Sequence, residues 1–460
     1  MKRYNDYKIS SIPLVGEIPF HWNEIKLKNL TTNRSDNFVD GPFGSDLKTE
    51  HYTDSGIPII QLNNLKDGEH INKNTKYTSE DKANKLKRSN IFPGDIVITK
   101  MMPVARAAIV NNEYDRYLIS SDCIKFLVDE EKIDKRFLVY AINCNYFRSN
   151  AESHSTGSTR LRTNLSLVKN FKVLYPPLQE QVAIANFLNE KSVHIQTIIK
   201  HKKILLETLQ KYRQSLISEN VTRGLNPHAK MKDSGVEWIG PIPEHWEVKK
   251  IKYLLDDIRI GPFGSSLKLD EMNESYQYKV YGQENLISNN FTLGHRFISN
   301  EKYKKMIQYK VSQGDLLISM MGTIGKSQVV PSTYTSGIID SHLMKLKIKT
   351  NMAIPKYISF VIDKSNYVEE FLRINSKGSI MSGLNSKIVK SISIALPPLE
   401  EQKNILEFIK NKSEEIEIAV NKIFNQIEVL QKYRQSLIYE AVTGKIDVRN
   451  YNESDLEVKR

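Results

Sequence analysis

Two segments of the chain carry apolar side chains in a repeat of seven residues. In the first segment the spacing alternates between four and three residues at Ile184, Leu188, Lys191, Ile195, Ile198, Lys202, Leu205, Leu209, Tyr212 and Leu216. In the second segment the same spacing holds at Ile405, Ile409, Lys412, Ile416, Ala419, Ile423, Gln426, Leu430, Tyr433 and Leu437. Such spacing over several heptads predicts two long helices with a coiled-coil seam. The alternative is a surface helix packed on its own domain, which needs a wider apolar stripe and is usually shorter.

A pair of prolines precedes each segment, at Pro176-Pro177 and at Pro397-Pro398, and sets the start of the helix. A helix over residues 179–216 would be about 57 Å long. Two such helices in one chain most simply pair antiparallel, and they would hold two globular domains apart in a pseudo-two-fold relation. Because one turn of B-DNA is about 34–36 Å, this spacer could separate two DNA readers by a turn or slightly more.

Outside these helices, short apolar runs rich in β-branched residues predict strands. They span residues 95–99, 107–110 and 124–128, with copies at 315–319, 328–330 and 344–348. Helical patterns cover residues 134–148 and 355–371. The predicted fold class is α+β, with two similar mixed α/β domains separated by two long helices.

The second half of the chain repeats the first. The eight residues Gln210 to Ile217 recur letter for letter at Gln431 to Ile438, a shift of 221. A period of this length indicates a duplicated domain rather than a solenoid. We therefore predict a first domain over residues 1–178, a first spacer helix over 179–222, a second domain over 223–398, a second spacer helix over 399–446 and a polar tail over 447–460.

The net charge is +13, and it lies outside the predicted helices. Residues 179–222 hold six basic and four acidic side chains, whereas residues 400–443 hold six basic and eight acidic ones. The helices together are neutral, so the two domains carry the positive charge. This distribution predicts that the domains bind a polyanion.

The remaining composition indicates a cytoplasmic protein. No apolar stretch approaches the length that spans a bilayer, and the N-terminus lacks the apolar core of a signal peptide. The two cysteines, Cys123 and Cys144, both lie in the first half, which argues against a structural disulfide or a zinc site.

The order of the repeated motifs resembles the specificity subunit of type I restriction-modification systems. The motifs are G-x-I-P-x-H-W at Gly16 and Gly240, G-P-F-G-S-x-L-K at Gly41 and Gly261, and P-P-L-x-E-Q at Pro176 and Pro397. Each long helix then ends in Q-K-Y-R-Q-S-L-I. The resemblance covers nearly the whole chain, and the doubled helix motif is highly specific.

This resemblance implies that each domain is a target recognition domain that reads one half of a bipartite site in double-stranded DNA. It implies that the helices dock two modification subunits, which carry S-adenosylmethionine and methylate adenine. Restriction subunits, which use ATP and Mg²⁺, would join to make the nuclease. This chain itself would hold no cofactor or metal and would catalyse no reaction.

Motifs that look catalytic are incomplete. Tyr175-Pro176-Pro177-Leu178 and its copy at Leu396 are similar to an adenine methyltransferase motif, but their first residue cannot hold an amino group. Gly325-Lys326-Ser327 is similar to the end of a phosphate-binding loop, yet Met320 stands where its first glycine should be. The histidines show no metal-ligand spacing in both copies, and His21 and His245 are expected to pack beside Trp22 and Trp246.

Candidate DNA contacts follow from matched positions. The G-P-F-G-S turns and the lysines after them offer backbone amides, hydroxyls and cations to a phosphate. Further along each copy, a second matched cation follows a predicted strand. These candidates are Phe43, Ser45, Lys48, Arg106, Phe263, Ser265, Lys268 and Lys326. Arg160 and Arg162 occur in the first copy alone, where Met381 and Gly383 stand in the second, and arginine reads guanine in the major groove. The alternatives are that the lysines are ordinary solvated surface residues and that the arginines reflect ordinary variation between loops.

Two other functions fit the same pattern. A stand-alone DNA-binding regulator would use the doubled domains without enzyme partners. A coiled-coil adaptor would use the basic domains to bind protein.

Overall fold

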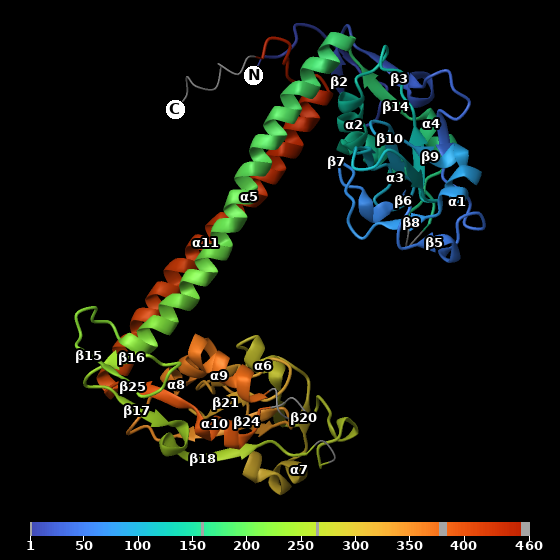
Figure 1. The fold of residues 1–460 in the computed structure, drawn as a ribbon. Coiled ribbons are helices and arrows are strands. Elements are labelled where there is room, and N and C mark those ends of the chain that lie inside the picture. Colours follow the sequence, from blue (N-terminus) through green and yellow to red (C-terminus); the bar gives the residue numbers. More distant parts are fainter. Residues whose placement is uncertain (1, 158–160, 264–265, 377–383, 452–460) are drawn as a thin grey trace. The chain divides into compact units, whose positions relative to one another are not determined.

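The computed structural model describes residues 2–157, 161–263, 266–376 and 384–451. Contacts between residues divide the chain into two compact units (Figure 1). Unit 1 combines Met1–His201 with Asn425–Arg460, and unit 2 is Lys202–Phe424. Each long helix therefore contributes one part to each unit, and unit 1 contains both ends of the chain.

Unit 1 contains two small antiparallel pairs and two five-stranded sheets. The pairs are β1 (Tyr7–Ile9) with β2 (Glu17–Pro19) and β3 (Asn23–Lys26) with β14 (Lys172–Tyr175). The first sheet has the order β4 (Phe38–Asp40), β13 (Cys123–Phe126), β10 (Ile96–Thr99), β11 (Ala107–Ile109) and β7 (Gly68–Glu69). The second has the order β5 (Tyr52–Thr53), β8 (Lys76–Thr78), β6 (Ile57–Ile60), β12 (Tyr117–Ile119) and β9 (Asn90–Ile91).

Unit 2 repeats this plan, with fewer strands among its described residues. Its pairs are β15 (Met231–Asp233) with β16 (Pro241–Pro243) and β17 (Glu247–Lys250) with β25 (Ser393–Leu396). Its first sheet has the order β18 (Leu255–Ile260), β24 (Leu343–Ile348), β21 (Leu316–Ser319) and β22 (Ser327–Val329). Its second has the order β20 (Phe297–Ile298), β19 (Tyr278–Tyr281) and β23 (Gly337–Ile339).

Short helices flank these sheets. In unit 1 they are α1 (Glu80–Lys85), α2 (Lys135–Asn143), α3 (Asn145–Ser153) and α4 (Leu165–Asn170). In unit 2 they are α6 (Gln283–Ile287), α7 (Asn300–Lys305), α8 (Pro355–Lys364), α9 (Asn366–Ser376) and α10 (Ser386–Ser391). Single turns of 3-10 helix lie at Leu27–Leu30, Thr49–His51, Leu62–Asn64, Lys87–Ser89, Ile251–Leu254, Leu269–Glu271 and Ile307–Tyr309. The prediction of mixed α/β domains with two long helices is confirmed.

The helices predicted over 134–148 and 355–371 are each two helices. The backbone turns extended at Cys144, with φ −72° and ψ 148°, and at Ser365, with φ −87° and ψ 130°. Neither position carries a glycine or proline, so the apolar pattern alone gave no sign of the break.

The long helices are α5 (Leu178–Arg223) and α11 (Leu399–Val442). Ile184 and Leu188 near the start of α5 share a hydrophobic core with Leu437 and Ala441 near the end of α11, all within unit 1. In unit 2, Leu216 and Val221 of α5 share a core with Ile405 and Ile409 of α11. In each unit the start of one helix thus packs with the end of the other, as the antiparallel pairing predicts.

The buried stripe departs from the predicted seam in the second half of α5 and in the second half of α11. Leu206 is 8% exposed whereas Leu205 is 46% exposed, and the same change in α11 buries Ile427 and exposes Gln426. The prediction of Leu205, Tyr212, Gln426 and Tyr433 as seam residues was wrong, because these side chains face solvent. Leu188, Ile195, Leu209 and Leu216, which are common to both readings, are buried or half-buried.

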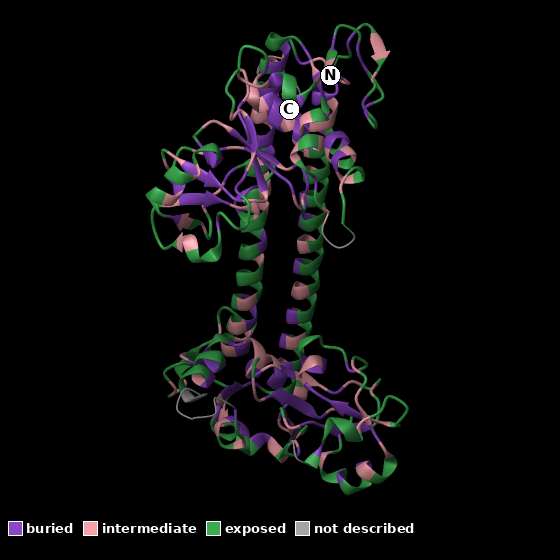
Figure 2. Cartoon of the chain, turned by 90° about the vertical axis from the view of Figure 1, so that its right-hand side faces the viewer, coloured by how far each residue is buried: buried purple, intermediate pink, exposed green. Residues whose placement is uncertain are grey.

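Burial differs between the sheets and the helices (Figure 2). The central strands β10, β12, β13 and β21 are fully buried, whereas the middle parts of α5 and α11 alternate between exposed and buried residues. Such a narrow buried stripe is typical of a helix pair rather than of a helix laid on a domain. Among the described residues no helix combines the length and apolar character needed to cross a membrane.

Candidate nucleic-acid interface

A glutamate fixes the first turn of each long helix to its unit. Glu180 accepts a 3.0 Å hydrogen bond from Trp22 Nε1 and lies 2.7 Å from His21 Nε2. In unit 2, Glu401 makes the same two contacts, at 2.7 Å with Trp246 and 2.9 Å with His245. Both indoles are fully buried. The histidines therefore pair with carboxylates, and the two matched motifs form one joint between domain and helix.

The glutamine after each glutamate completes this joint. Gln181 Oε1 accepts a 2.8 Å bond from the backbone N–H of Asp134, and its Nε2 donates a 2.8 Å bond to the carbonyl of Pro176. In unit 2 the same bonds, also of 2.8 Å, join Gln402 to Ile354 and Pro397. The start of the long helix thereby sets the start of α2 in unit 1 and of α8 in unit 2.

Three loops meet at one edge of the first sheet in unit 1. Gly41, which follows β4, donates its N–H to the carbonyl of Cys123 in β13 at 2.9 Å. Lys100, which follows β10, donates its N–H to the carbonyl of Asp122 at 2.8 Å. At the same edge, Lys100 and Asp40 form an ion pair of 2.9 Å, which links the end of β4 to the loop after β10.

Unit 2 builds the same edge with the same backbone bonds. Gly261 donates to Leu343 at 2.9 Å, and Met320 donates to the carbonyl of His342 at 2.9 Å. The side chains at the three equivalent positions nevertheless differ. They are Asp40, Lys100 and Asp122 in unit 1, but Ile260, Met320 and His342 in unit 2.

Gly41 and Gly261 are required by this crossing. A Cβ at Gly41 would lie 1.9 Å from the carbonyl oxygen of Ser120, and one at Gly261 would lie 1.7 Å from that of Asp340. These glycines thus allow two backbones to approach each other. Gly44 has no heavy atom within 4 Å of its own Cβ position, so the space beside it is open.

The turn after each glycine presents exposed side chains. Phe43 is 81% exposed and Phe263 is 86% exposed, although the neighbouring prolines are buried. Ser45, Lys48 and Lys268 are also exposed, and Lys48 lies 3.6 Å from Glu50. Ser265 lies outside the described residues.

Arg106 and Lys326 are held by carboxylates of their own units. Arg106 contacts Asp67 at 2.9 Å and also donates to the carbonyl of Leu65. Although burial raises it, hydrogen bonds from Arg148 and Arg106 hold the pKa of Asp67 below its usual value. Lys326 contacts Asp363 at 2.9 Å. A contact of either cation with a phosphate would require exchange of its carboxylate partner.

Arg162 joins the edge from the segment before α4. Its backbone pairs with Met101 and with Thr156, and its guanidinium lies 3.7 Å from Asp122. This segment therefore lies beside two loops, the one that follows β10 and the one that precedes β13. Arg160, and the predicted counterparts Met381 and Gly383, lie outside the described residues.

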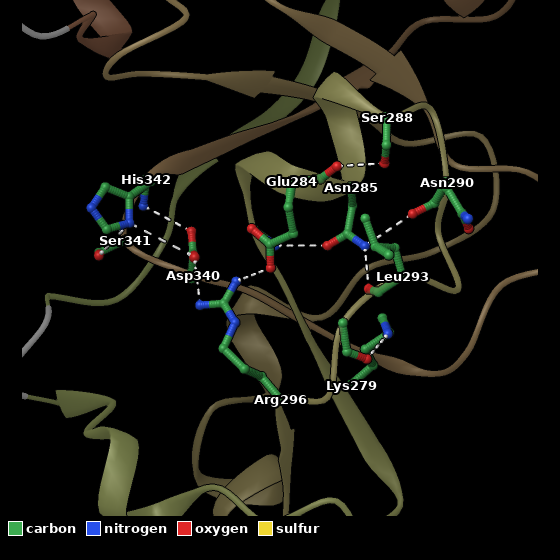
Figure 3. Close-up of polar contacts among 12 residues, drawn as sticks. Lys279, Glu284, Asn285, Ser288, Asn290, Leu293, Arg296, Asp340, Ser341 and His342 are labelled. Atoms are coloured by element: carbon green, nitrogen blue, oxygen red, sulfur yellow. Dashed lines mark hydrogen bonds and ion pairs between the residues drawn. The ribbon is translucent and has the colours of Figure 1, made fainter. Parts of the chain in front are cut away.

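A polar cluster lies at the equivalent edge in unit 2 (Figure 3). Arg296 contacts Asp340 at 3.0 Å and Glu284 at 2.6 Å, and its side chain lies between the two carboxylates. Asp340 also accepts a 2.9 Å bond from the backbone N–H of His342. The imidazole of His342 is left half exposed at the edge of this cluster.

Sequence reasoning missed a pair of buried asparagines that hold the loop after β6 and its copy after β19. Asn64 Oδ1 accepts a 3.0 Å bond from the N–H of Gln61, and Asn285 Oδ1 accepts one of the same length from Gly282. Each Nδ2 donates to two backbone carbonyls further along its loop. The matched Asn-Leu dipeptides, 221 residues apart, were the available signal.

The motifs that looked catalytic serve the fold. Pro176-Pro177 and Pro397-Pro398 join a strand to a long helix, and Ser327 bonds to Ser359 inside unit 2. Among the described residues, no group of three or more histidine, cysteine, aspartate or glutamate side chains is arranged to hold a metal ion.

Comparison with known proteins agrees with this architecture. The family model of the type I restriction modification DNA specificity domain matches residues 44–208 and 243–429. The chain is 25% identical over 447 residues to the putative type I restriction enzyme MjaX specificity subunit of Methanocaldococcus jannaschii, covering 95% of this chain and 96% of that protein. It is 20% identical over 455 residues to the EcoKI specificity subunit of Escherichia coli, covering 94% and 90%.

Solved structures share the fold. A chain from a structure of a type I R-M system, solved to explain complex assembly and conformational transition, matches with a TM-score of 0.68 at 15% identity and covers 93% of this chain and 99% of that one. The HsdS subunit from Thermoanaerobacter tengcongensis matches with a TM-score of 0.55 at 17% identity, covering 93% and 98%.

The family model matches two segments that together span most of the chain, so this protein belongs to the family of type I restriction-modification DNA specificity proteins. It is a specificity subunit with two recognition domains, and its role is to select the DNA sequence rather than to catalyse a reaction.

Proposed function

We propose that the two domains, residues 1–178 and 223–398, each read one half of a bipartite site in double-stranded DNA. The helices α5 and α11, in the predicted segments 179–222 and 399–446, act as the spacer between the two readers. The tail over 447–460 follows the second helix, and its residues 452–460 lie outside the described part of the chain.

One observation supports this proposal most directly. The two units support the same sheet edge with the same backbone bonds, yet they place Asp40, Lys100 and Asp122 there in one case and Ile260, Met320 and His342 in the other. Carboxylates accept from the amino group of cytosine, lysine donates to guanine, and apolar side chains contact the thymine methyl group. A shared support with different side chains is what two readers of different base pairs require.

The candidate contacts divide into two kinds. Lys48, Lys268, Ser45 and Ser265 are suited to phosphates, which position a protein on the duplex without reading its sequence. Arg160 and Arg162 are suited to base edges in unit 1. Arg106 and Lys326 belong to the phosphate class, and their contact with DNA requires release from Asp67 and Asp363.

The repeated octamer marks where we expect the partner subunits to dock. Within it, the matched tyrosines Tyr212 and Tyr433 are 55% and 51% exposed, and the lysines before them are exposed as well. Packing does not require identical residues at exposed positions. Two identical surfaces suit two copies of one partner, so we infer that each octamer contributes to the docking of one modification subunit.

The cofactors of the proposed complex belong to its other subunits. S-adenosylmethionine would be bound by the modification subunits, and ATP and Mg²⁺ by the restriction subunits that join them. The complex would act in the cytoplasm, where the host DNA lies.

Sequencing of methylated bases in the host with and without this gene tests the proposal. We expect one bipartite motif to lose its methylation when the gene is deleted, and that motif is the recognition sequence. A stand-alone regulator would leave every methylated motif unchanged and would bind a specific site tightly as the purified chain. An adaptor would show no salt-dependent affinity for DNA.

A further inference from the structure

We propose that Phe43 and Phe263 are wedges that insert between neighbouring base pairs, one in each half of the DNA site. This inference rests on the proposed function and extends it to a change in the shape of the DNA. Among the described residues these two are the most exposed aromatic side chains, and they occupy equivalent places in the two units.

Each phenyl ring stands on a fixed support. In unit 1 the turn is closed by N–H groups of Asp46 and Leu47, which donate to the carbonyl of Phe43 at 2.9 and 3.2 Å. Pro42, which precedes the ring in the chain, and Leu47, which follows it, are both buried. The backbone is thus held while the phenyl ring points away from the core, which reduces the entropy lost on binding.

Unit 2 repeats this support. Phe263 accepts a 2.8 Å bond from the N–H of Ser266, and Pro262 and Leu267 are buried beside it. An exposed phenyl ring contributes nothing to the core of its own unit, and a polar residue would be better solvated there. The ring is nevertheless present in both copies, so we assign it a contact outside the chain.

The surroundings favour DNA over protein as that contact. Lys48 and Lys268 lie five residues after the rings and are exposed, and the whole net charge of +13 lies outside the two helices. The rings also stand beside the edge where the side chains of the two units differ. Phenylalanine is among the apolar residues that unstack a base step and kink a duplex. Unstacking also lowers the cost of extruding a base for an enzyme that modifies it.

The test uses the complex of this chain with its modification subunit and duplexes that carry the methylated motif. The fluorescent base 2-aminopurine replaces one base at a time across each half, because its emission rises when it is unstacked. Phe43→Ala, Phe263→Ala and Phe43→Trp are compared with the parent complex. Ile9→Ala is the control, since Ile9 is 84% exposed but belongs to β1 and not to the turn.

We expect the parent complex to brighten one step in each half. Phe43→Ala should abolish the signal in the first half alone and weaken binding by about tenfold, Phe263→Ala should do so in the second half, and Phe43→Trp should restore it. Ile9→Ala should change neither quantity. The inference is overturned if the alanine variants keep both signals. It is also overturned if these variants release the modification subunit while the remaining complexes unstack DNA as before, because the rings would then contact protein. Either result leaves the proposed function standing, because that depends on the gene-dependent methylated motif.

Discussion

Trp22 Nε1 donates a 3.0 Å hydrogen bond to Glu180, the third residue of the 46-residue helix α5. Tyr4 Oη donates to the same carboxylate at 3.1 Å, and His21 lies 2.7 Å from it. The carboxylate is largely buried, with its side chain 9% exposed, whereas that of Glu401 in unit 2 is 36% exposed. One buried acceptor therefore joins the N-terminal segment of unit 1 to the spacer helix.

Glu180→Ala should destabilise unit 1 by about 3 kcal/mol, because two buried donors lose their acceptor. Glu401→Ala should cost about 1 kcal/mol, because the Glu401 side chain is 36% exposed and water can take the place of its carboxylate. The rate of thiol labelling reports the opening of unit 1 selectively, because Cys123 and Cys144 both lie in that unit and are buried. Burial raises their pKa values to about 12 and about 11. We expect Glu180→Ala to accelerate labelling and Glu401→Ala to leave it nearly unchanged. Equal rates in the two variants would refute a local joint.

Gly41→Ala should disrupt the sheet edge of unit 1, because the new Cβ would meet the carbonyl oxygen of Ser120 at 1.9 Å. We expect a loss of at least about 3 kcal/mol in unfolding free energy and weak methylation of the site. Gly44→Ala is the matched control, since its Cβ has no heavy atom within 4 Å. Thermal unfolding and methylation of a duplex carrying the motif measure both effects. Equal behaviour of the two variants would contradict the close backbone crossing.

The stability of unit 1 should fall as the pH drops from about 7 toward 4. Burial lowers the pKa of His70 to about 4, against an opposing effect of Glu113, while the unfolded chain titrates near 6.5. Between these values the unfolded state binds a proton that the folded state does not, so acidification favours unfolding by up to about 3 kcal/mol. Above about 6.5 this contribution is fully present and constant. His70→Phe, which introduces the residue found 221 positions later at Phe291, should flatten the profile measured by urea unfolding. A profile as steep as that of the parent would exclude His70 as the cause.

Removal of one heptad from each long helix should shorten the unspecified spacer of the DNA site. Deletion of residues 199–205 together with 420–426 keeps the seam in phase, whereas deletion of five residues from each rotates it and should cost assembly first. Mapping of methylated motifs on the heptad variant gives the new spacer. Retained methylation with an unchanged spacer would mean that the modification subunits, not the helices, set the distance between the readers.

Parts of the fold that depend on local patterns were predictable. The strand over 96–99 and the two long helices follow from β-branched runs, from proline pairs and from seven-residue spacing. The seam prediction failed at Leu205 because Leu206 is also a leucine, and spacing alone cannot choose between neighbours that point about 100° apart.

Parts that depend on residues far apart in the chain were not predictable. Glu180 and Trp22 are 158 positions apart, and their motifs were matched in the repeat without any sign that they touch. Phe43 stands between a proline and a glycine, and this local sequence fits a buried core residue as well as an exposed residue of a turn. The structure exposes Phe43 while Pro42 and Leu47 are buried, and this division depends on the tertiary fold. Which loops meet at the sheet edge likewise depends on strand order, which a single sequence does not give.

The central claim is that the two domains read the two halves of the site independently, and a domain exchange tests it most directly. Residues 1–178 are replaced by the first domain of another member of the family, and the methylated motif is mapped in the host. The account predicts that one half of the motif changes while the other half and the spacer stay the same. A change in both halves, in a complex that still methylates DNA, would contradict it.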